Sequence, residues 1–405
     1  MLRTYKSRLY PTKSQEERLL WTLEQCRFTY NKLLEGLQQQ DKPNQNKLQH
    51  SLLVLKEQYP MLKKSYSKVL QHENHRLFSN LRSLAQRKKN GKKAGRLRFK
   101  NRHSFKTFTY NQSGFKIIPS GLRYDKLHLA KIDDIPFIMH RDVSGVVKQV
   151  TIKHYPSGKW FALIAAEEQT TPLPSTNTRS VGIDLGLMNY VADSEGNRVS
   201  HPKHLERSLL KLKKAQQRLS RKKKGSKNRS KQKINVARVH EKIANQRNDF
   251  LHKLSRCYVN NYGLIAVENL NINGLVKLSY NARNMMDASW SRFVQMLCFK
   301  AASAGCTVVK VEPRGTTQKC SRCGTIVPKR LWDRMHNCAC GFRADRDYNA
   351  ALNILKRALG QELPESTPVE IRTKVPIPPS LGAEQVQSLK QDAQTLVLGS
   401  SQHFL

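Results

Sequence analysis

Three acidic residues of this 405-residue chain lie within or beside apolar segments. Asp184 falls inside "VGIDLGL", Glu268 follows the apolar run of "LIAVENL", and Asp347 opens "DYNAALNIL". A carboxylate buried at such a position is costly unless a cation or a hydrogen-bond donor meets it. If two strands and one helix bring these carboxylates together, they can bind two Mg²⁺ ions, and such a site hydrolyses phosphodiester bonds.

Each acid also has an ordinary structural interpretation. Asp184 could cap a turn, Glu268 could serve the structure alone, and Asp347 could be the N-cap of its helix. The chain, however, has 30 Asp and Glu against 72 Lys and Arg. In so basic a chain, the joint occurrence of three acids at the ends of apolar segments favours one shared site.

Four cysteines form a second candidate site. Cys320-x-x-Cys323 and Cys338-x-Cys340, each pair followed by glycine, have about the spacing of a zinc ribbon. Four thiolates leave no open coordination position, so we expect one structural Zn²⁺ ion. Two alternatives stay open, namely His336 in place of one cysteine and a disulfide. The remaining cysteines are expected to be buried free thiols: Cys26, Cys257, Cys298 and Cys306.

The net charge points to the class of partner. A formal charge of +42 favours a polyanion, because binding to nucleic acid releases condensed counterions. A membrane surface is the rival interpretation. The sequence has no run of about 18 apolar residues and no apolar signal-peptide core near its start. We therefore expect a soluble intracellular protein with no membrane partner.

Two segments concentrate the positive charge. Residues 82–106 hold eleven Lys or Arg and residues 207–238 hold fourteen, without any acid in either. "RKKKGSKNRSKQK" could also be a solvated turn or a nuclear import signal, and Phe99 and Phe105 could be core residues or stacking platforms. The candidate nucleic-acid contacts are Arg96, Arg98, Lys100, Arg221, Lys222, Lys223, Lys224 and Lys227.

Strand-like and helical patterns alternate up to residue 167. Residues 1–10 predict a strand that joins a later β-barrel, and residues 11–90 predict a helical domain beginning with a capping box from Ser14 to Glu17. Residues 91–167 predict the β-barrel module, with a hairpin across Pro156-Ser157-Gly158. Residues 168–178 predict a linker.

From residue 179 onward, short apolar strands alternate with helices. "SVGIDLGL", "GLIAVENL" and "CTVVKVEP" predict strands, and residues 203–256 predict a long basic helical hairpin between the first two. Residues 315–342 contain the four cysteines, and residues 343–360 predict a last helix. Residues 361–405, rich in Pro, Gln, Ser and Glu, predict a disordered tail. We expect a multidomain α+β protein.

These motifs, in this order and spacing, resemble the TnpB proteins of bacterial and archaeal insertion sequences, also called OrfB. The resemblance rests on "VGIDLGL", "AVENLNI", "KCSRCG…CACG" and "DRDYNAALNIL", and on the basic "LSRKKKGSKNRSKQK" and "VHEKIANQRNDFLHK". It extends over residues 1–365. TnpB proteins are RNA-guided DNA endonucleases related to the type V CRISPR effectors.

The resemblance implies a split RuvC nuclease of the RNase H-like fold at residues 179–314 and 343–360, with the zinc ribbon inserted at 315–342. Its catalytic acids, which bind Mg²⁺, would be Asp184, Glu268 and Asp347. Asp345 competes for the third role, but the acid of the family stands two residues before an asparagine, here Asn349. The helical domain and the wedge-like barrel would recognise a guide RNA and a short target-adjacent motif in double-stranded DNA.

The expected function is thus RNA-guided, metal-dependent cleavage of DNA by a transposable element. The expected location is the prokaryotic cytoplasm, in association with the nucleoid. A nuclease-inactive RNA-guided DNA-binding protein is one alternative. A DNA-strand-transferring transposase is another, although the sequence contains no His-x-His motif.

Overall fold

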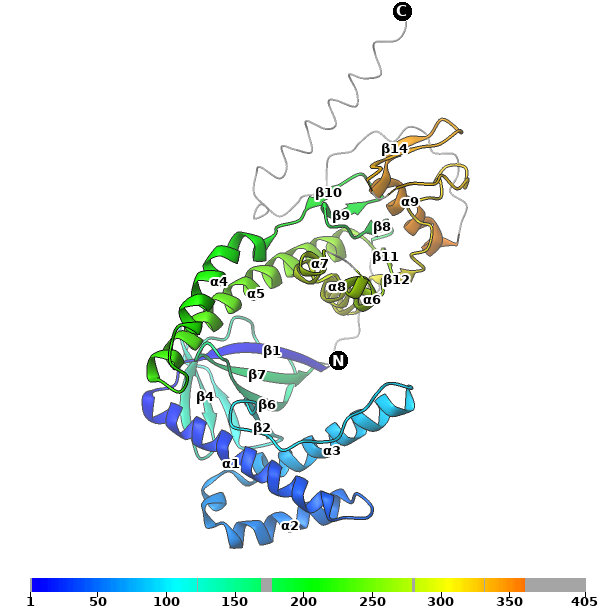
Figure 1. The fold of residues 1–405 in the computed structure, drawn as a ribbon. Coiled ribbons are helices and arrows are strands. Elements are labelled where there is room, and N and C mark those ends of the chain that lie inside the picture. The colour runs from blue at the N-terminus through cyan, green and yellow to red at the C-terminus, as the bar shows by residue number, and fades with distance from the viewer. Residues whose placement is uncertain (1, 122, 169–176, 279–280, 331, 361–405) are drawn as a thin grey trace, which may run out of the picture. The chain divides into compact units, whose positions relative to one another are not determined.

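The computed structural model describes residues 2–121, 123–168, 177–278, 281–330 and 332–360 (Figure 1). The described chain divides near residue 170 into two compact units. Most of the predicted linker (168–178) and all of the predicted disordered tail (361–405) lie outside the described residues. Helices and strands occur in both units, which confirms the multidomain α+β class.

Helices follow the first strand of the N-terminal unit. They are α1 (Lys13–Gln38), α2 (Gln45–Gln58), a short 3₁₀ helix (Pro60–Lys64) and α3 (Ser67–Lys89). The predicted capping box was wrong by two residues, because Thr12 and Gln15 form it and α1 begins at Lys13. The S/T-x-x-E/Q pattern occurs twice here, and the sequence alone does not decide which copy lies at the helix end.

A seven-stranded antiparallel sheet, barrel-like in form, completes this unit. Its order is β2-β6-β7-β1-β5-β4-β3, so the first strand lies between two strands that come much later in the chain (Figure 1). This arrangement confirms a barrel-like module that takes in the first strand. The strands are β1 (Leu2–Leu9), β2 (Thr107–Asn111), β3 (Phe115–Ile118), β4 (Asp125–Leu129), β5 (Asp133–Phe137), β6 (Val146–His154) and β7 (Trp160–Glu167).

The core of the N-terminal unit separates the two phenylalanines of the basic segment. Phe105 is buried, and the guanidinium of Arg76 lies 4.6 Å from its ring centroid. Phe99 is 55% exposed. Phe105 is therefore a core residue, whereas Phe99 stays available for stacking.

The C-terminal unit contains a mixed five-stranded sheet. The strands are β8 (Ser180–Asp184), β9 (Asn189–Asp193), β10 (Arg198–Ser200), β11 (Leu264–Glu268) and β12 (Thr307–Val311), in the order β10-β9-β8-β11-β12. The hairpin strand β9 pairs antiparallel with β8 and β10, whereas β8, β11 and β12 are parallel. Parallel neighbours require crossover segments, and helices supply them here.

Helices cover both faces of this sheet. The helices are α4 (His204–Ser220), α5 (Lys227–Asn261), α6 (Ile272–Leu278), α7 (Ala282–Ala288), α8 (Trp290–Ala304) and α9 (Arg346–Leu359). Val181 and Ile183 of β8 belong to one apolar core with Phe250 of α5 and Phe293 of α8. The opposite face packs on α9, where Ile354 contacts the alternate residues of β11 and β12.

The cysteine segment forms a small ribbon between β12 and α9. It contains the two-stranded sheet β13 (Met335–Asn337) and β14 (Arg343–Asp345), and α9 begins directly after it. The first helical turn of α9 is thus covalently tied to the ribbon.

Candidate active site

Asp184 and Glu268 end neighbouring parallel strands. Ile183 of β8 pairs with Val267 of β11, so the two acids follow at the same level on both strands. Because side chains alternate along a strand, both carboxylates share the face of Gly182, which is the face covered by α9. The two residues are 9% and 8% exposed.

Asp347 reaches the same face from the first turn of α9. A Cβ built on Gly182 would lie 2.2 Å from the carbonyl oxygen of Ala351, so the strand and the helix approach here more closely than a side chain allows. Ala351 lies one helical turn after Asp347, and Gly182 lies two residues before Asp184. The helix therefore directs Asp347, 8% exposed, toward Asp184.

Asp345, the competing candidate, has a structural role. Its Oδ1 accepts hydrogen bonds from the backbone N–H groups of Asp347 and Tyr348, so it is the N-cap of α9. Its other carboxylate oxygen lies 3.4 Å from the guanidinium of Arg198. Asp345 rather than Asp347 thus satisfies the end of the helix.

The carboxylate of Asp184 interacts electrostatically with those of Glu268 and Asp347. Burial raises the pKa of Asp184 well above its ordinary value, and the neighbouring charges of Glu268 and Asp347 raise it further. Burial also raises the pKa of Glu268, against a hydrogen bond from Thr316 that lowers it. Such a cluster of buried carboxylates is short of positive charge.

The donor set fits divalent cations. Carboxylate oxygens are the ligands that Mg²⁺ prefers, and a cation would offset both the burial and the carboxylate repulsion that raise the pKa of Asp184. Among the described residues, the four cysteines form the one group of three or more potential ligands that is already close enough to hold a metal ion, and the three carboxylates do not form such a group.

Two side chains at this site were not anticipated from the sequence. Nε of Arg346 lies 3.4 Å from Oδ1 of Asp347, and its charge lowers the pKa of Asp184. The hydroxyl of Thr316 donates a hydrogen bond to Oε1 of Glu268 over 2.6 Å. Arg346 could have been noticed because it directly precedes Asp347, whereas Thr316 lies 48 residues after Glu268 and carries no sequence signal.

The four cysteines of the ribbon come together as predicted. Their sulfur atoms lie within 4.8 Å of one another, with 3.8 Å between Cys320 and Cys340 and 3.5 Å between Cys323 and Cys338. A tetrahedral zinc ion with Zn–S bonds of about 2.3 Å places its sulfurs about 3.8 Å apart. The cluster therefore fits zinc, and all four thiols are free rather than joined in disulfides.

His336 is not a member of this cluster. Its imidazole is buried, and Nδ1 contacts the ammonium of Lys329 instead of the sulfur atoms. The short second spacer is accommodated by a turn, because Gly341 adopts φ +82° directly after Cys340 and its N–H bonds the carbonyl of Cys338.

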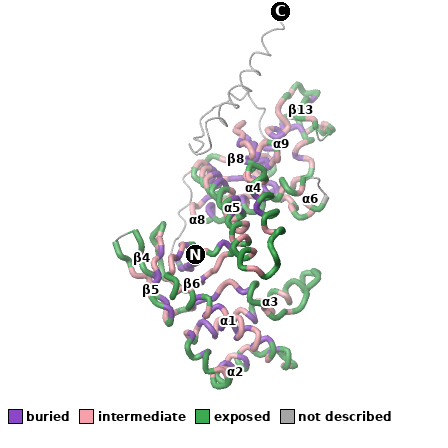
Figure 2. Tube along the Cα trace, turned by 60° about the vertical axis from the view of Figure 1, so that its left-hand side comes forward, coloured by how far each residue is buried: buried purple, intermediate pink, exposed green. Residues whose placement is uncertain are grey.

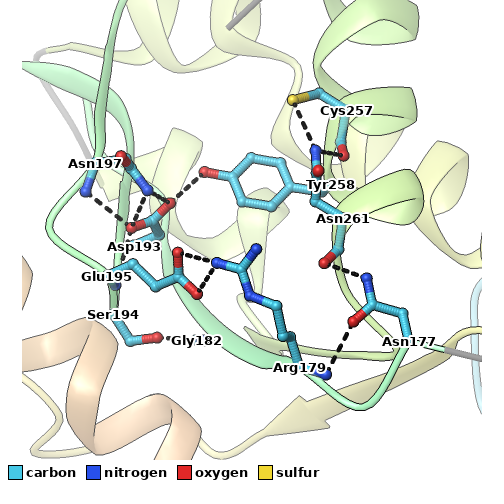
Figure 3. A network of polar contacts seen from close by, with 10 residues as sticks. All are labelled: Asn177, Arg179, Gly182, Asp193, Ser194, Glu195, Asn197, Cys257, Tyr258 and Asn261. Atoms are coloured by element: carbon cyan, nitrogen blue, oxygen red, sulfur yellow. Dashed lines mark hydrogen bonds and ion pairs between the residues drawn. The ribbon is translucent and has the colours of Figure 1, made fainter. Parts of the chain in front are cut away.

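A network of polar contacts supports the β8–β9 hairpin close to the site (Figure 3). Asp193, at the end of β9, accepts hydrogen bonds from Glu195, Asn197 and the hydroxyl of Tyr258. Ser194 accepts a hydrogen bond from the backbone of Gly182. Although burial raises the pKa of Asp193, its oxygens are saturated with donors, which indicates an anchor between the hairpin and α5 rather than a metal ligand.

The candidate nucleic-acid contacts belong to different units. In the C-terminal unit, Arg221, Lys222, Lys223, Lys224 and Lys227 are exposed at the turn between α4 and α5 (Figure 2). This turn is well defined, since Nη1 of Arg229 donates to the carbonyls of Leu219 and Lys222.

In the N-terminal unit, Arg96 and Arg98 are exposed and Lys100 is half-buried. Both backbone polar groups of Lys100 bond the side chain of Asn31, and its ammonium lies 5.8 Å from the centroid of the Tyr30 ring.

The described part of the chain contains no helix with the length and apolar character that a membrane span requires.

Three family models match the chain. "Probable transposase" matches residues 163–279, "Cas12f1-like, TNB domain" matches residues 290–354, and "Helix-turn-helix domain" matches residues 1–45. The second of these matches contains the ribbon cysteines and Asp347, and the first contains Asp184 and Glu268.

Two relatives align with most of the chain. A "Putative RNA-guided DNA endonuclease" of Streptomyces pristinaespiralis is 35% identical over 373 residues, which is 88% of this chain and 89% of the relative. The "Putative RNA-guided DNA endonuclease InsQ" of Escherichia coli K12 is 29% identical over 384 residues, which is 87% and 92%.

A solved structure shares the fold. The "Cryo-EM structure of the Cas12f1-sgRNA-target DNA complex" contains a protein chain that is similar to this one. The similarity covers 84% of this chain and 82% of the other chain, with a TM-score of 0.57 and 17% sequence identity.

Proposed function

Because the chain belongs to the TnpB (OrfB) family, which is related to the type V CRISPR effectors, we propose that it is an RNA-guided, metal-dependent DNA endonuclease of a transposable element. A guide RNA and a double-stranded target DNA are its partners, and the cut lies near a short target-adjacent motif. The cytoplasm of a prokaryote is the corresponding location.

The chemistry belongs to the three buried carboxylates. Asp184, Glu268 and Asp347 would hold two Mg²⁺ ions, and the chemistry these ions would supply is activation of a water molecule and stabilisation of the leaving oxygen of the phosphodiester. The residues themselves supply a rigid, water-poor frame, because the strands and α9 are packed through Gly182. Arg346 neutralises part of the negative charge beside Asp347.

The ribbon has a structural role in this proposal. One Zn²⁺ on Cys320, Cys323, Cys338 and Cys340 would close a segment in which, among the described residues, Cys320 and Cys338 are the only buried apolar side chains. The exposed basic residues of the two units bind nucleic acid mainly through its phosphates, while base pairing with the guide supplies sequence specificity.

One observation carries the proposal. Two acids end adjacent parallel strands on the face covered by α9, a third enters from that helix, and each is at most 9% exposed. Asp193, a structural carboxylate of the same unit, is by contrast saturated with donors.

The test compares cleavage with binding. The RNA that copurifies with the protein is sequenced, and a DNA duplex matching its guide segment is incubated with the complex and Mg²⁺. Asp184→Ala is expected to abolish cleavage while RNA and target affinities stay within about threefold, because the change removes a metal ligand and no nucleic-acid contact. Asp249→Ala, at an exposed acid that pairs with Lys253 on the same helix, is the control.

Two results would reject the assignment. Normal cleavage by Asp184→Ala would remove the acidic site from the mechanism. Guided binding by the wild-type protein without any cleavage would favour the nuclease-inactive alternative.

A further inference from the structure

Glu268 has a hydrogen-bond donor from the segment that leads into the zinc ribbon. The Thr316 hydroxyl lies 2.6 Å from Oε1 of Glu268, the length typical of an O–H donor on a charged oxygen. It lies 3.1 Å from the carbonyl oxygen of Pro313, so the carboxylate is the closer acceptor. Thr316 is 2% exposed, and water therefore does not compete for this contact.

Two asparagines of α9 hold the segment that carries Thr316. Nδ2 of Asn353 donates to the carbonyls of Thr316 and Lys319, at 2.8 and 2.6 Å. Nδ2 of Asn349 donates to Lys319, and its Oδ1 accepts from the backbone N–H of Ser321 at 2.9 Å. These bonds lie on both sides of Cys320, the first cysteine of the ribbon.

The asparagines are one helical turn apart on the helix that also carries Asp347. Both are buried, at 0% and 3% exposure, and buried amides are tolerated where fixed partners satisfy them. One helix therefore positions Asp347 directly and Glu268 through Thr316. The zinc ribbon begins in the segment that these asparagines hold, between Thr316 and Ser321.

We propose that Thr316 is a positioning residue of the nuclease, whose hydroxyl orients the Glu268 carboxylate toward the divalent cation while Asn349 and Asn353 hold Thr316 in place. This role rests on the proposed nuclease function. The hydroxyl occupies Oε1 and leaves Oε2 for a cation, and it removes the freedom of the carboxylate to rotate. Outer partners of this kind typically contribute about 10- to 100-fold in metal affinity or activity.

The experiment uses the full chain with its copurified RNA and three variants. Thr316→Val removes the hydroxyl at nearly constant shape, and Thr316→Ser keeps it. Thr317→Val is the matched control, because it makes the same change at the next, half-buried position. Cleavage is measured as a function of Mg²⁺ concentration. Mn²⁺ binding is measured by calorimetry, with the Asp184→Ala complex as the blank. Zinc content is measured by elemental analysis.

Thr316→Val is expected to need about tenfold more Mg²⁺ for half-maximal cleavage and to bind Mn²⁺ at least about tenfold more weakly. Thr316→Ser should restore both values, and Thr317→Val should leave them unchanged. All variants should retain zinc, which separates positioning of Glu268 from unfolding of the ribbon.

The positioning role is overturned if Thr316→Val matches the wild type in both measurements, or if Thr316→Ser is as defective as Thr316→Val. Absence of guided cleavage by the wild type would instead defeat the proposed function. In that case Mn²⁺ binding alone still decides whether Thr316 orients Glu268.

Discussion

Gly182 of β8 faces the carbonyl oxygen of Ala351 in α9 so closely that a Cβ on Gly182 would lie 2.2 Å from it. Both partners are backbone, so neither can turn aside as a flexible side chain would. This contact sets the distance between the strand that carries Asp184 and the helix that carries Asp347.

Gly182→Ala should therefore separate α9 from the sheet. We expect a loss of about 1–3 kcal/mol in the free energy of unfolding, as for overpacked cores. We expect the cleavage rate to fall by a larger fraction than the free energy of unfolding does. Thermal unfolding followed by circular dichroism and a cleavage assay measure the two effects. Gly95→Ala, which meets open space at ordinary φ, should leave the unfolding temperature unchanged. If Gly182→Ala cleaves DNA at the rate of the wild type, the close approach of β8 and α9 is not needed for cleavage.

Zinc should be present at about one equivalent per chain and should be lost in Cys320→Ser, because the remaining three thiolates bind more weakly. The unfolding temperature should fall together with the zinc content. Elemental analysis before and after chelation measures the stoichiometry. Cys298→Ser, at a half-buried thiol outside the cluster, is the control. Substantially less than one zinc in the wild type would contradict a site made of four thiolates.

Glu73 of α3 predicts a pH dependence of stability in the N-terminal unit. Burial raises the pKa of this fully buried carboxyl from 4.5 to about 8, although Arg76 lies 3.5 Å away and opposes the change. Between these pH values the folded state binds more protons than the unfolded state, so stability should fall as pH rises. The slope from this one group is at most about 1.4 kcal/mol per pH unit inside the window.

Glu73→Gln should remove this slope and be more stable than the wild type at pH 8. Unfolding temperatures at pH 5, 6.5 and 8 provide the measurement. Glu35→Gln, at an exposed acid paired with Lys32, should keep the wild-type slope. Parallel curves for Glu73→Gln and the wild type would disprove the raised pKa.

The turn between α4 and α5 should bind phosphates without reading sequence. Replacing Lys222, Lys223 and Lys224 by alanine should weaken RNA binding and reduce the slope of log affinity against log salt by about 2–3, because each phosphate contact contributes about 0.7–0.9. Fluorescence anisotropy at several salt concentrations measures the slope. Arginine at the same three positions keeps the charge and should keep the slope. An unchanged slope in the alanine variant would make this turn a solvated one.

The residues that could bind metal or carry out catalysis were recognisable from the sequence. Asp184 and Glu268 stand out because a carboxylate at the end of an apolar strand is costly to bury, and the cysteine pairs stand out by spacing. The basic segments indicate a polyanion partner from composition alone. These are local signals, since each depends on residues within a few positions of one another.

Tertiary structure decided how these groups are held. The match between Ile183 and Val267, the contact of Gly182 with Ala351, and the bond from Thr316 to Glu268 each join segments far apart in the chain. The choice of Thr12 over Ser14 as the helix cap was also made by the folded chain. Register and hydrogen-bond partners depend on how whole elements pack, and no local pattern encodes the distance between two elements that meet only after folding.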